Sequence, residues 1–488
     1  MTSRNDDRRT ACILKTLLHK SASVLVLTSI ALGLGAPAYS QQQESPSGAS
    51  AKKPNVIFIL ADDWGWGDLG VYGHQQLRTP HLDQLARRGT LWTQFYVNAS
   101  VCTPSRVAFM TGQFPGKLGV HHVMDGGETS RRYGVPDYLD PKIPNIAQLL
   151  HNAGYATAHF GKWHLGRTPN APLPERYGFD VSLTVNSNDK RGPRELGQAN
   201  RPHSSARIVD ETIRFVESNR HKPFFVNLWL QDTHSRLEPT IEQMEAYPNL
   251  PKGSPRRIYY SAATEADKQI GRLLQRLDEI GLSENTIVIF SSDNGPEDAS
   301  IYDSSVGSTG PFRGRKRSIY DGGVRAPLIV RWTGTIPAGR VDNQSVLSGV
   351  DFLPTICALT GVPIPVGSNL DGENMAAALR GQTVRRTKLL FWEWRFRIFG
   401  DTINRSPRLA MREGNWKLLM NPDGSRVELY DIPSDQSEVD NLASQHKAAV
   451  ASMSKRLLGW AAQLPKALAD EDAGMNAYPF PKQEPTNK

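Results

Sequence analysis

The sequence predicts an α/β fold: a large mixed, mostly parallel sheet flanked by helices, followed by a small C-terminal α+β subdomain with an antiparallel sheet. Short apolar runs alternate with helical stretches from residue 53 onward, and polar clusters follow several of the runs. Past about residue 380 the runs become shorter and are joined by turns. Continuous apolar strands separated by amphipathic helices are typical of parallel sheets that are covered on both faces. We therefore expect one domain over residues 53–382 and a C-terminal subdomain over residues 383–488.

The elements follow from these patterns in chain order. Four apolar runs predict buried strands at residues 55–61, 156–160, 224–230 and 286–291. Helical stretches lie at residues 79–88, 143–153, 205–219 and 261–280. In the C-terminal subdomain we expect short strands at residues 389–394, 408–412, 416–420 and 426–430, and a terminal helix at residues 444–464.

The N-terminal segment predicts export. Basic residues up to Lys20 precede an apolar stretch over residues 23–36, which the small residues Ala38 and Ser40 follow. A charged start, an apolar stretch too short to span a bilayer comfortably and a small-x-small site mark a signal peptide. We expect a signal peptide over residues 1–40 and a flexible lead-in over residues 41–52, with an uncleaved membrane anchor as the alternative. The mature protein would be periplasmic or secreted, without membrane attachment after cleavage.

The mild positive charge does not indicate nucleic-acid binding. The 488 residues include 57 Lys and Arg against 49 Asp and Glu, a formal charge of +8. This surplus is spread along the chain and forms no basic run with interleaved aromatic residues. We therefore expect no nucleic-acid partner, and the sequence leaves the oligomeric state open.

Cys102 lies at the N-terminus of a predicted helix, in the stretch Cys102-Thr-Pro-Ser-Arg106. Pro104 is typical of a first helical turn, and apolar residues follow it. A helix N-terminus carries free N–H groups and partial positive charge, and Arg106 adds a cation one turn on. From these residues alone, Cys102 could be a thiolate nucleophile with a lowered pKa or a cysteine with no role. Cys357, in an apolar run, is predicted to be a small buried hydrophobe.

Polar residues follow each of the four predicted strands of the large sheet. In chain order they are Asp62 and Asp63, Lys162 and His164, His234, and Asp293 and Asn294. In an open α/β sheet the ligand site lies beyond the carboxyl ends of the strands. The acids and the amide are oxygen ligands, which hard cations such as Ca²⁺ or Mg²⁺ prefer. Without a cation, clustered carboxylates would repel one another and raise each other's pKa.

Several motifs in this order resemble those of the type I sulfatases of the alkaline phosphatase superfamily. Residues 102–106 are similar to the C-x-P-S-R signature of that family. The other similar stretches are residues 62–70, 161–166, 292–295, 314–316 with 320–323, and 428–431 with 441–443. The likeness spans more than 350 residues. It implies an alkaline phosphatase-like fold, with residues 53–382 as the catalytic domain of a sulfuric ester hydrolase.

The resemblance also implies a cofactor and a role for each site residue. A maturation enzyme would oxidise Cys102 to formylglycine before folding, and the hydrate of that aldehyde would supply the nucleophilic hydroxyl. The ligands of one calcium ion would be Asp62, Asp63, Asp293, Asn294 and the modified residue 102. The remaining roles are Arg106 for fixing the hydrate, Lys162 and Lys316 for the sulfate oxygens and the leaving-group charge, His234 as general acid, His164 for the proton of the second hydroxyl, and Asp293 as a possible base for the attacking hydroxyl.

The motifs most resemble arylsulfatases and the N-acetylgalactosamine-6-sulfatase type, which implies a small-molecule or oligosaccharide sulfate ester as substrate. A phosphonate or phosphodiester hydrolase of the same superfamily and a non-catalytic carbohydrate-binding relative are the alternatives. The intact set of site residues argues against the non-catalytic one. Side chains left open between pocket lining and ordinary packing are His121, His122, Trp64 and Trp66, while Arg236 and Glu238 are candidate substrate contacts.

Overall fold

The computed structural model describes residues 52–185 and 198–475. The predicted signal peptide and all but the last residue of the lead-in lie outside the described residues. Within the described part, no helix has the length and apolar character needed to cross a membrane.

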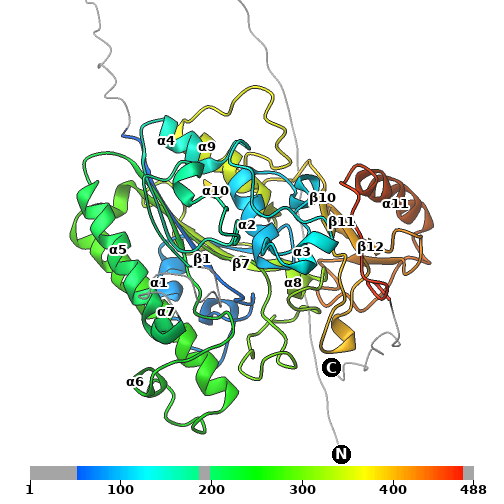
Figure 1. Ribbon diagram of the computed structural model, residues 1–488, viewed down its shortest axis with the longest axis horizontal. Coiled ribbons are helices and arrows are strands. Elements are labelled where there is room, and N and C mark those ends of the chain that lie inside the picture. Colours follow the sequence, from blue (N-terminus) through cyan, green and yellow to red (C-terminus); the bar gives the residue numbers. More distant parts are fainter. Residues whose placement is uncertain (1–51, 186–197, 476–488) are drawn as a thin grey trace, which may run out of the picture. The chain divides into compact units, whose positions relative to one another are not determined.

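Among the described residues, the larger of two sheets has nine strands and is nearly all parallel (Figure 1). Its order is β4 (Val181–Val185), β3 (Ala156–Lys162), β5 (Phe224–Trp229), β1 (Asn55–Ala61), β6 (Thr286–Ser292), β7 (Arg325–Arg331), β2 (Thr90–Tyr96) and β8 (Arg340–Asp342), and β9 (Leu347–Ser348) also pairs with β2. The strands from β4 to β6 in this order pair in parallel. β7 alone runs against its neighbours β6 and β2. The predicted mostly parallel sheet is therefore confirmed.

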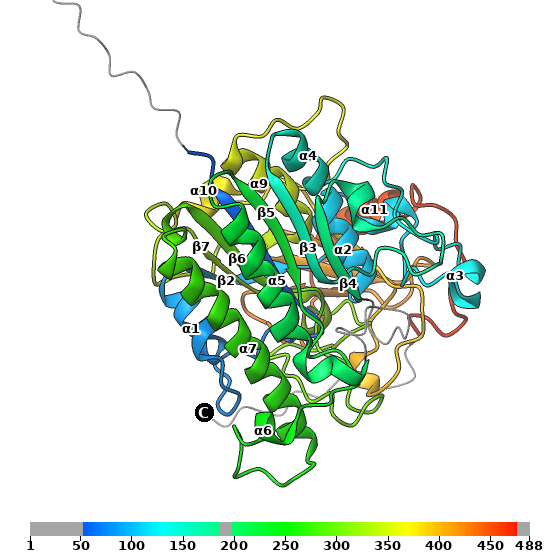
Figure 2. The same ribbon diagram turned by 60° about the vertical axis from the view of Figure 1, so that its left-hand side comes forward.

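Helices cover both faces of this sheet (Figure 2). The α-helices of the described residues are α1 (Pro80–Arg87), α2 (Cys102–Thr111), α3 (Glu128–Arg132), α4 (Ile146–Asn152), α5 (Ser204–Ser218), α6 (Ile241–Met244), α7 (Pro255–Glu279), α8 (Asp321–Val324), α9 (Phe352–Thr360), α10 (Ala376–Leu379) and α11 (Lys447–Ala461). Short 3-10 helices occur at Gly70–Tyr72, Pro115–Leu118, Pro174–Tyr177, Gln198–His203, Ser283–Asn285, Gly349–Asp351 and Thr402–Asn404.

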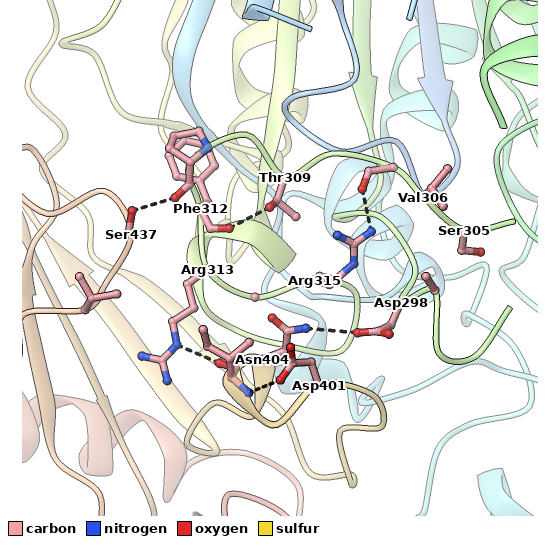
Figure 3. A pocket seen from close by; sticks show the side chains of 16 residues that line it. Asp298, Ser305, Val306, Thr309, Phe312, Arg313, Arg315, Asp401, Asn404 and Ser437 are labelled. Carbon is pink, nitrogen blue, oxygen red and sulfur yellow. Dashed lines mark hydrogen bonds between the residues drawn. The ribbon is translucent and has the colours of Figure 1, made fainter. Parts of the chain in front are cut away.

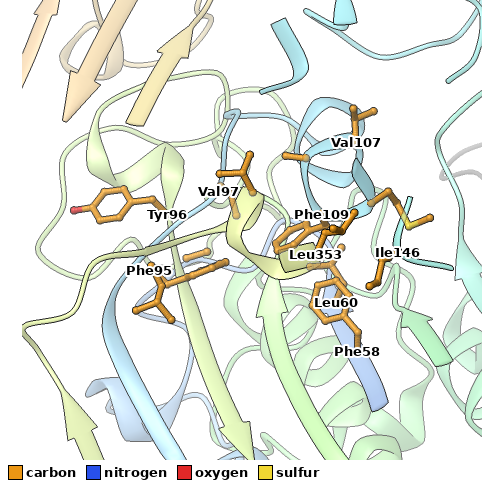
Figure 4. Close-up of a cluster of buried hydrophobic side chains, with 14 of the residues drawn as sticks. Phe58, Leu60, Phe95, Tyr96, Val97, Val107, Phe109, Ile146 and Leu353 are labelled. Atoms are coloured by element: carbon orange, nitrogen blue, oxygen red, sulfur yellow. The ribbon is translucent and has the colours of Figure 1, made fainter. Parts of the chain in front are cut away.

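The pleat of β1 divides the core into two layers. Val56, Phe58 and Leu60 face the layer that contains α2, α4 and α9, and the aromatic rings of Phe58 and Phe109 lie 5.0 Å apart there (Figure 4). Ile57 and the next alternate residues face the layer that contains α1, α5 and α7. Every residue of β1 is buried, because a central parallel strand packs against helices on both faces.

The C-terminal part forms a second, antiparallel sheet of four strands among the described residues. Its strands are β10 (Leu390–Glu393), β11 (Leu409–Glu413), β12 (Trp416–Met420) and β13 (Glu428–Asp431), and α11 packs on β11 and β12. The indole of Trp392 donates to the carbonyl of Val97 at 2.7 Å, which joins this sheet to the segment after β2. The predicted α+β subdomain is confirmed as an antiparallel sheet with a terminal helix, whereas its boundary after residue 382 stays a prediction.

Candidate active site

Four adjacent strands of the large sheet deliver the predicted site residues to one edge. β3, β5, β1 and β6 are neighbours and run parallel, so their carboxyl ends meet there. The residues at these ends are Lys162 as the last residue of β3, His164 two positions further, His234 after β5, Asp62 and Asp63 after β1, and Asp293 and Asn294 after β6. This is the edge at which open α/β sheets bind ligands.

Cys102 is the first residue of α2, as its sequence context predicts, and it is buried at this edge. Its Sγ lies 3.5 Å from Asp62 Oδ1 and 3.9 Å from Asp63 Oδ1. Burial and the charge of Asp293 raise the pKa of the Cys102 thiol well above its usual range. The raised pKa favours the protonated thiol and so does not support the interpretation of Cys102 as a low-pKa thiolate nucleophile.

Arg106 lies one turn further along α2 and is completely buried. Its Nε and one Nη donate to Asp293 Oδ2 at 3.0 and 2.7 Å, and the other Nη donates to the Lys162 carbonyl at 2.8 Å. The guanidinium also lies 5.0 Å from the ring centroid of Trp229. Arg106 thereby connects α2 to the ends of β6 and β3, and it brings a fixed cation beside Cys102.

Two lysines pair with the two acids that follow β1. Lys162 Nζ donates to Asp62 Oδ2 and Lys316 Nζ donates to Asp63 Oδ2, both at 2.6 Å. Burial alone would raise the pKa of Asp62, but the charge of Lys162 holds it well below its usual range. Lys316 comes from the irregular segment after β6, so a strand-end rule does not predict its position.

The oxygen atoms of this cluster fit a hard divalent cation. One ligand atom each from Asp62, Asp63, Cys102 and Asp293 lies within 4.8 Å of all the others. Burial raises the pKa of Asp293 to about 6, and the negative charge of Asp62 adds to this shift by repulsion. Asn294 donates through Nδ2 to Asp63 Oδ1 at 2.7 Å, while its buried Oδ1 has no partner among the described residues. A cation would relieve the repulsion and satisfy that oxygen.

Both predicted histidines lie in this cationic environment. Burial and the charge of Lys162 hold the pKa of His234 and of His164 well below the usual range. His234 Nδ1 lies 2.7 Å from the carbonyl oxygen of Ser235. Because a carbonyl only accepts, Nδ1 carries the hydrogen and Nε2 is left for exchange of a proton. The carbonyl of His164 accepts a hydrogen bond from Thr103 Oγ1 at 2.8 Å, which ties this turn to α2.

The structure shows the surroundings of the side chains for which the sequence did not decide between pocket lining and ordinary packing. His121 is buried and pairs with Glu393 of β10, and the His122 ring packs 4.5 Å from that of Phe396. Trp64 is core packing against Phe290, and Trp66 lies between the rings of Tyr72 and Phe312. Arg236 and Glu238 are exposed in the segment after His234 and stay candidate substrate contacts. Cys357 is buried in α9, as predicted.

Sequence reasoning missed a buried carboxylate beside Lys316. Glu297 Oε2 lies 3.7 Å from Lys316 Nζ, and the Glu297 carboxylate also pairs with Arg317. Lys316 therefore lies between two acids, Asp63 and Glu297. The sequence offers a signal for placing Glu297 near the site, since Glu297 follows Asn294 by three residues and Arg317 is adjacent to Lys316.

A cavity of about 530 Å³ borders the same segment (Figure 3). Polar side chains of its lining are Asp298, Thr309, Arg313, Arg315, Asp401, Asn404 and Ser437. Arg315 precedes Lys316 in the chain, and Ser305 Oγ lies 2.7 Å from the Oγ of Ser235, the residue after His234. The cavity wall is thus continuous with the segments that carry Lys316 and His234.

Comparison with known families identifies the family of the chain. The model of the family described as Sulfatase matches residues 54–362. The chain belongs to the sulfatase family. A second family model, described as N-sulphoglucosamine sulphohydrolase, C-terminal, matches residues 310–463. The protein is therefore an enzyme that hydrolyses sulfate esters. The predicted resemblance to the type I sulfatases of the alkaline phosphatase superfamily is confirmed.

Relatives and solved structures agree with this assignment. Arylsulfatase A of Homo sapiens is 32% identical over 411 residues, which cover 77% of this chain and 76% of the relative. The N-acetylgalactosamine-6-O-sulfatase of Bacteroides thetaiotaomicron is 27% identical over 525 residues, 88% of this chain and 97% of the relative. The structure of Ps i-CgsB in complex with k-i-k-neocarrahexaose superposes with a TM-score of 0.73 at 26% identity, covering 87% and 97% of the two chains. The phosphonate monoester hydrolase of Agrobacterium radiobacter shares the fold, with a TM-score of 0.62 at 21% identity over 88% and 100% of the chains.

Proposed function

We propose that this sulfatase removes sulfate from a sulfated carbohydrate, using a formylglycine at position 102 and one calcium ion. The observation that carries the proposal is the cluster at the sheet edge, where Cys102 contacts the carboxylates of Asp62 and Asp63 beside one arginine and two lysines. The names of a galactosamine sulfatase relative and of a structural neighbour bound to neocarrahexaose support a carbohydrate substrate. The polar lining of the adjoining cavity suits sugar hydroxyls.

The calcium ligands would be Asp62, Asp63, Asp293, the Asn294 side-chain oxygen and residue 102. When bound, the ion would offset the carboxylate charges and attract the anionic sulfate group. The aldehyde hydrate at residue 102 would supply a hydroxyl nucleophile and a second hydroxyl for the release of sulfate.

The fixed cations supply the binding energy that an anionic substrate needs. A sulfate ester is already negatively charged, so an electron-rich nucleophile is repelled unless positive charge surrounds the group. Lys162 pairs with Asp62 and Lys316 pairs with Asp63, and two hydrogen bonds to Asp293 hold Arg106. In this arrangement the two ammonium groups orient the sulfate oxygens, and Arg106 orients residue 102.

The two histidines would transfer the protons of the reaction. In its imidazolium form, His234 would deliver the Nε2 proton to the leaving oxygen, while its Nδ1 hydrogen stays directed to the Ser235 carbonyl. Burial and the charges of Lys162 and Lys316 lower the pKa of His234, and the negative charge of a bound sulfate group would favour the imidazolium form. His164, held by the Thr103 hydrogen bond, would accept the proton of the second hydroxyl.

Maturation would precede folding and export would place the enzyme outside the cytoplasm. Cys102 is only 2% exposed and the whole of α2 is buried, so a maturation enzyme could reach the thiol only in the unfolded chain. The predicted signal peptide supports a periplasmic or secreted location for the mature protein.

The proposal is tested on protein purified from its own host. Formylglycine makes the tryptic peptide of residues 89–106 lighter by about 18 Da than its thiol form. We expect the lighter peptide, together with release of sulfate from sulfated oligosaccharides that is faster than release of phenol from a phosphonate monoester such as phenyl phenylphosphonate. Active protein that holds only the thiol form would contradict the formylglycine mechanism, and activity on aryl sulfates alone would contradict the carbohydrate substrate.

A further inference from the structure

Lys316 lies on a segment without regular structure, so its position depends on how that segment is held. The backbone N–H of Lys316 donates to the Pro296 carbonyl at 3.0 Å, and that of Arg317 donates to the Ser100 carbonyl at 2.9 Å. These bonds fix the middle of the segment. We call residues 313–321 the lysine loop.

Both ends of the lysine loop are held by one residue of the C-terminal part, Glu438. At the first end, Arg313 Nη1 donates to the Glu438 carbonyl at 2.9 Å, and its Nε donates to the Ile403 carbonyl. At the other end, the backbone N–H of Asp321 donates to the Glu438 carboxylate at 2.5 Å. The Gly322 N–H then closes the loop by donating to the Arg313 carbonyl at 2.7 Å.

Lys417 of β12 joins the two acids at this point. Its Nζ lies 2.7 Å from Asp321 Oδ1 and 2.8 Å from Glu438 Oε1, and all three side chains are fully buried. We call Asp321, Lys417 and Glu438 the anchor cluster. Figure 1 shows α8, which begins at Asp321, beside the strands of the C-terminal sheet. Without the ammonium group, two buried carboxyl groups would face each other with no shared cation, and the end of the loop would have to shift.

We propose that Lys417 and Glu438 are positioning residues that hold Lys316 in its place opposite Asp63. The antiparallel subdomain thereby contributes to the reaction without touching the sulfate group. This inference rests on the proposed role of Lys316 in binding the sulfate oxygens.

A double-mutant cycle on the full-length mature enzyme tests the proposal. Lys417→Met should lower kcat/KM by up to about 100-fold, because small displacements of a charge-stabilising group have effects of that size. If Lys417 acts through Lys316, adding Lys417→Met to Lys316→Ala should change the rate by no more than about twofold. Lys417→Arg, which keeps the charge, should recover part of the loss.

Arg386→Met is the matched control. Arg386 also forms a buried pair, with two hydrogen bonds to Asp351 at 2.5 and 3.0 Å, and neither residue contacts the lysine loop in the hydrogen bonds and ion pairs of the described residues. Its effect on kcat/KM should be the same in the parent enzyme and in the Lys316→Ala variant. If Lys417→Met does not fold, Glu438→Gln replaces it in the same cycle.

The outcomes separate the two proposals. Fold-changes of Lys417→Met and Lys316→Ala that simply multiply would overturn the positioning role and leave the sulfatase site intact. An unchanged rate for Lys316→Ala alone would instead contradict the proposed role of Lys316.

Discussion

The lysine loop joins two clusters of buried charges, since its Lys316 pairs with Asp63 and its last residue is Asp321, and the two clusters differ in whether they are complete. The anchor cluster contains one ammonium group that contacts both of its carboxyl groups directly. The cluster at the sheet edge contains three carboxylates, an unpartnered Asn294 oxygen within the described residues and a protonated thiol against two acids. Burial of charge is common to both. What distinguishes the reactive one is the set of ligand atoms that the protein itself does not satisfy.

The largest effect is expected for a substitution of Cys102, which should change the rate of the reaction but not the stability of the fold. Replacing Cys102 with Ala should lower the rate of sulfate release by at least about 10⁴-fold, because it removes the nucleophile precursor. The melting temperature should change little, since the thiol makes only long contacts of 3.5 and 3.9 Å. Thermal unfolding and sulfate release are measured on the same preparation. Residual activity close to that of the parent enzyme would place the nucleophile elsewhere.

The anchor cluster should instead show itself in the pH dependence of stability. Burial and the charge of Asp321 raise the pKa of Glu438 to about 7, although Lys417 opposes the shift. Because the folded state binds this proton more tightly than the unfolded state, the contribution is full below about pH 4.5 and is lost as the pH rises to about 7. Glu438→Gln should therefore flatten the decrease in unfolding free energy over this interval. A variant with the same slope as the parent protein would assign that decrease to other groups.

How much of the fold and of the two clusters can be predicted from the sequence depends on how far apart along the chain the contacting residues lie. The strands β1, β3, β5 and β6 are continuous apolar runs, so both they and the polar residues at their ends are predicted. β7 was missed because Arg residues flank it and Pro327 interrupts its apolar run, and β2 and β4 lack a continuous apolar pattern. Lys316 was found only through resemblance. The anchor cluster escaped prediction, because Lys417 and Asp321 are 96 residues apart and their pairing depends on packing between two sheets.

Calcium should stabilise only the incomplete cluster. Addition of the ion to chelator-treated enzyme should raise the unfolding free energy by about 2.7 kcal/mol at a concentration of 100 times Kd. Asp293→Asn should abolish most of this gain, whereas Glu438→Gln should retain it, because the anchor cluster offers no open ligand position. Differential scanning calorimetry with and without calcium measures both variants. Equal gains in both would show that the ion binds away from the sheet edge.

An exposed ion pair gives the smallest expected effect and the reference for both clusters. Arg456 of α11 and Glu413 of β11 form two hydrogen bonds at 2.6 and 2.5 Å, yet their side chains are 37% and 43% exposed. Water already solvates both charges, so the pair recovers little free energy when it forms, and salt screens it further. Arg456→Gln should lower the unfolding free energy by no more than about 1 kcal/mol, and the difference should shrink in about 1 M salt. A larger loss would mean that short distances alone predict the strength of an ion pair. The contrast between the two buried clusters would then have to be explained by geometry rather than by which ligand atoms are left unsatisfied.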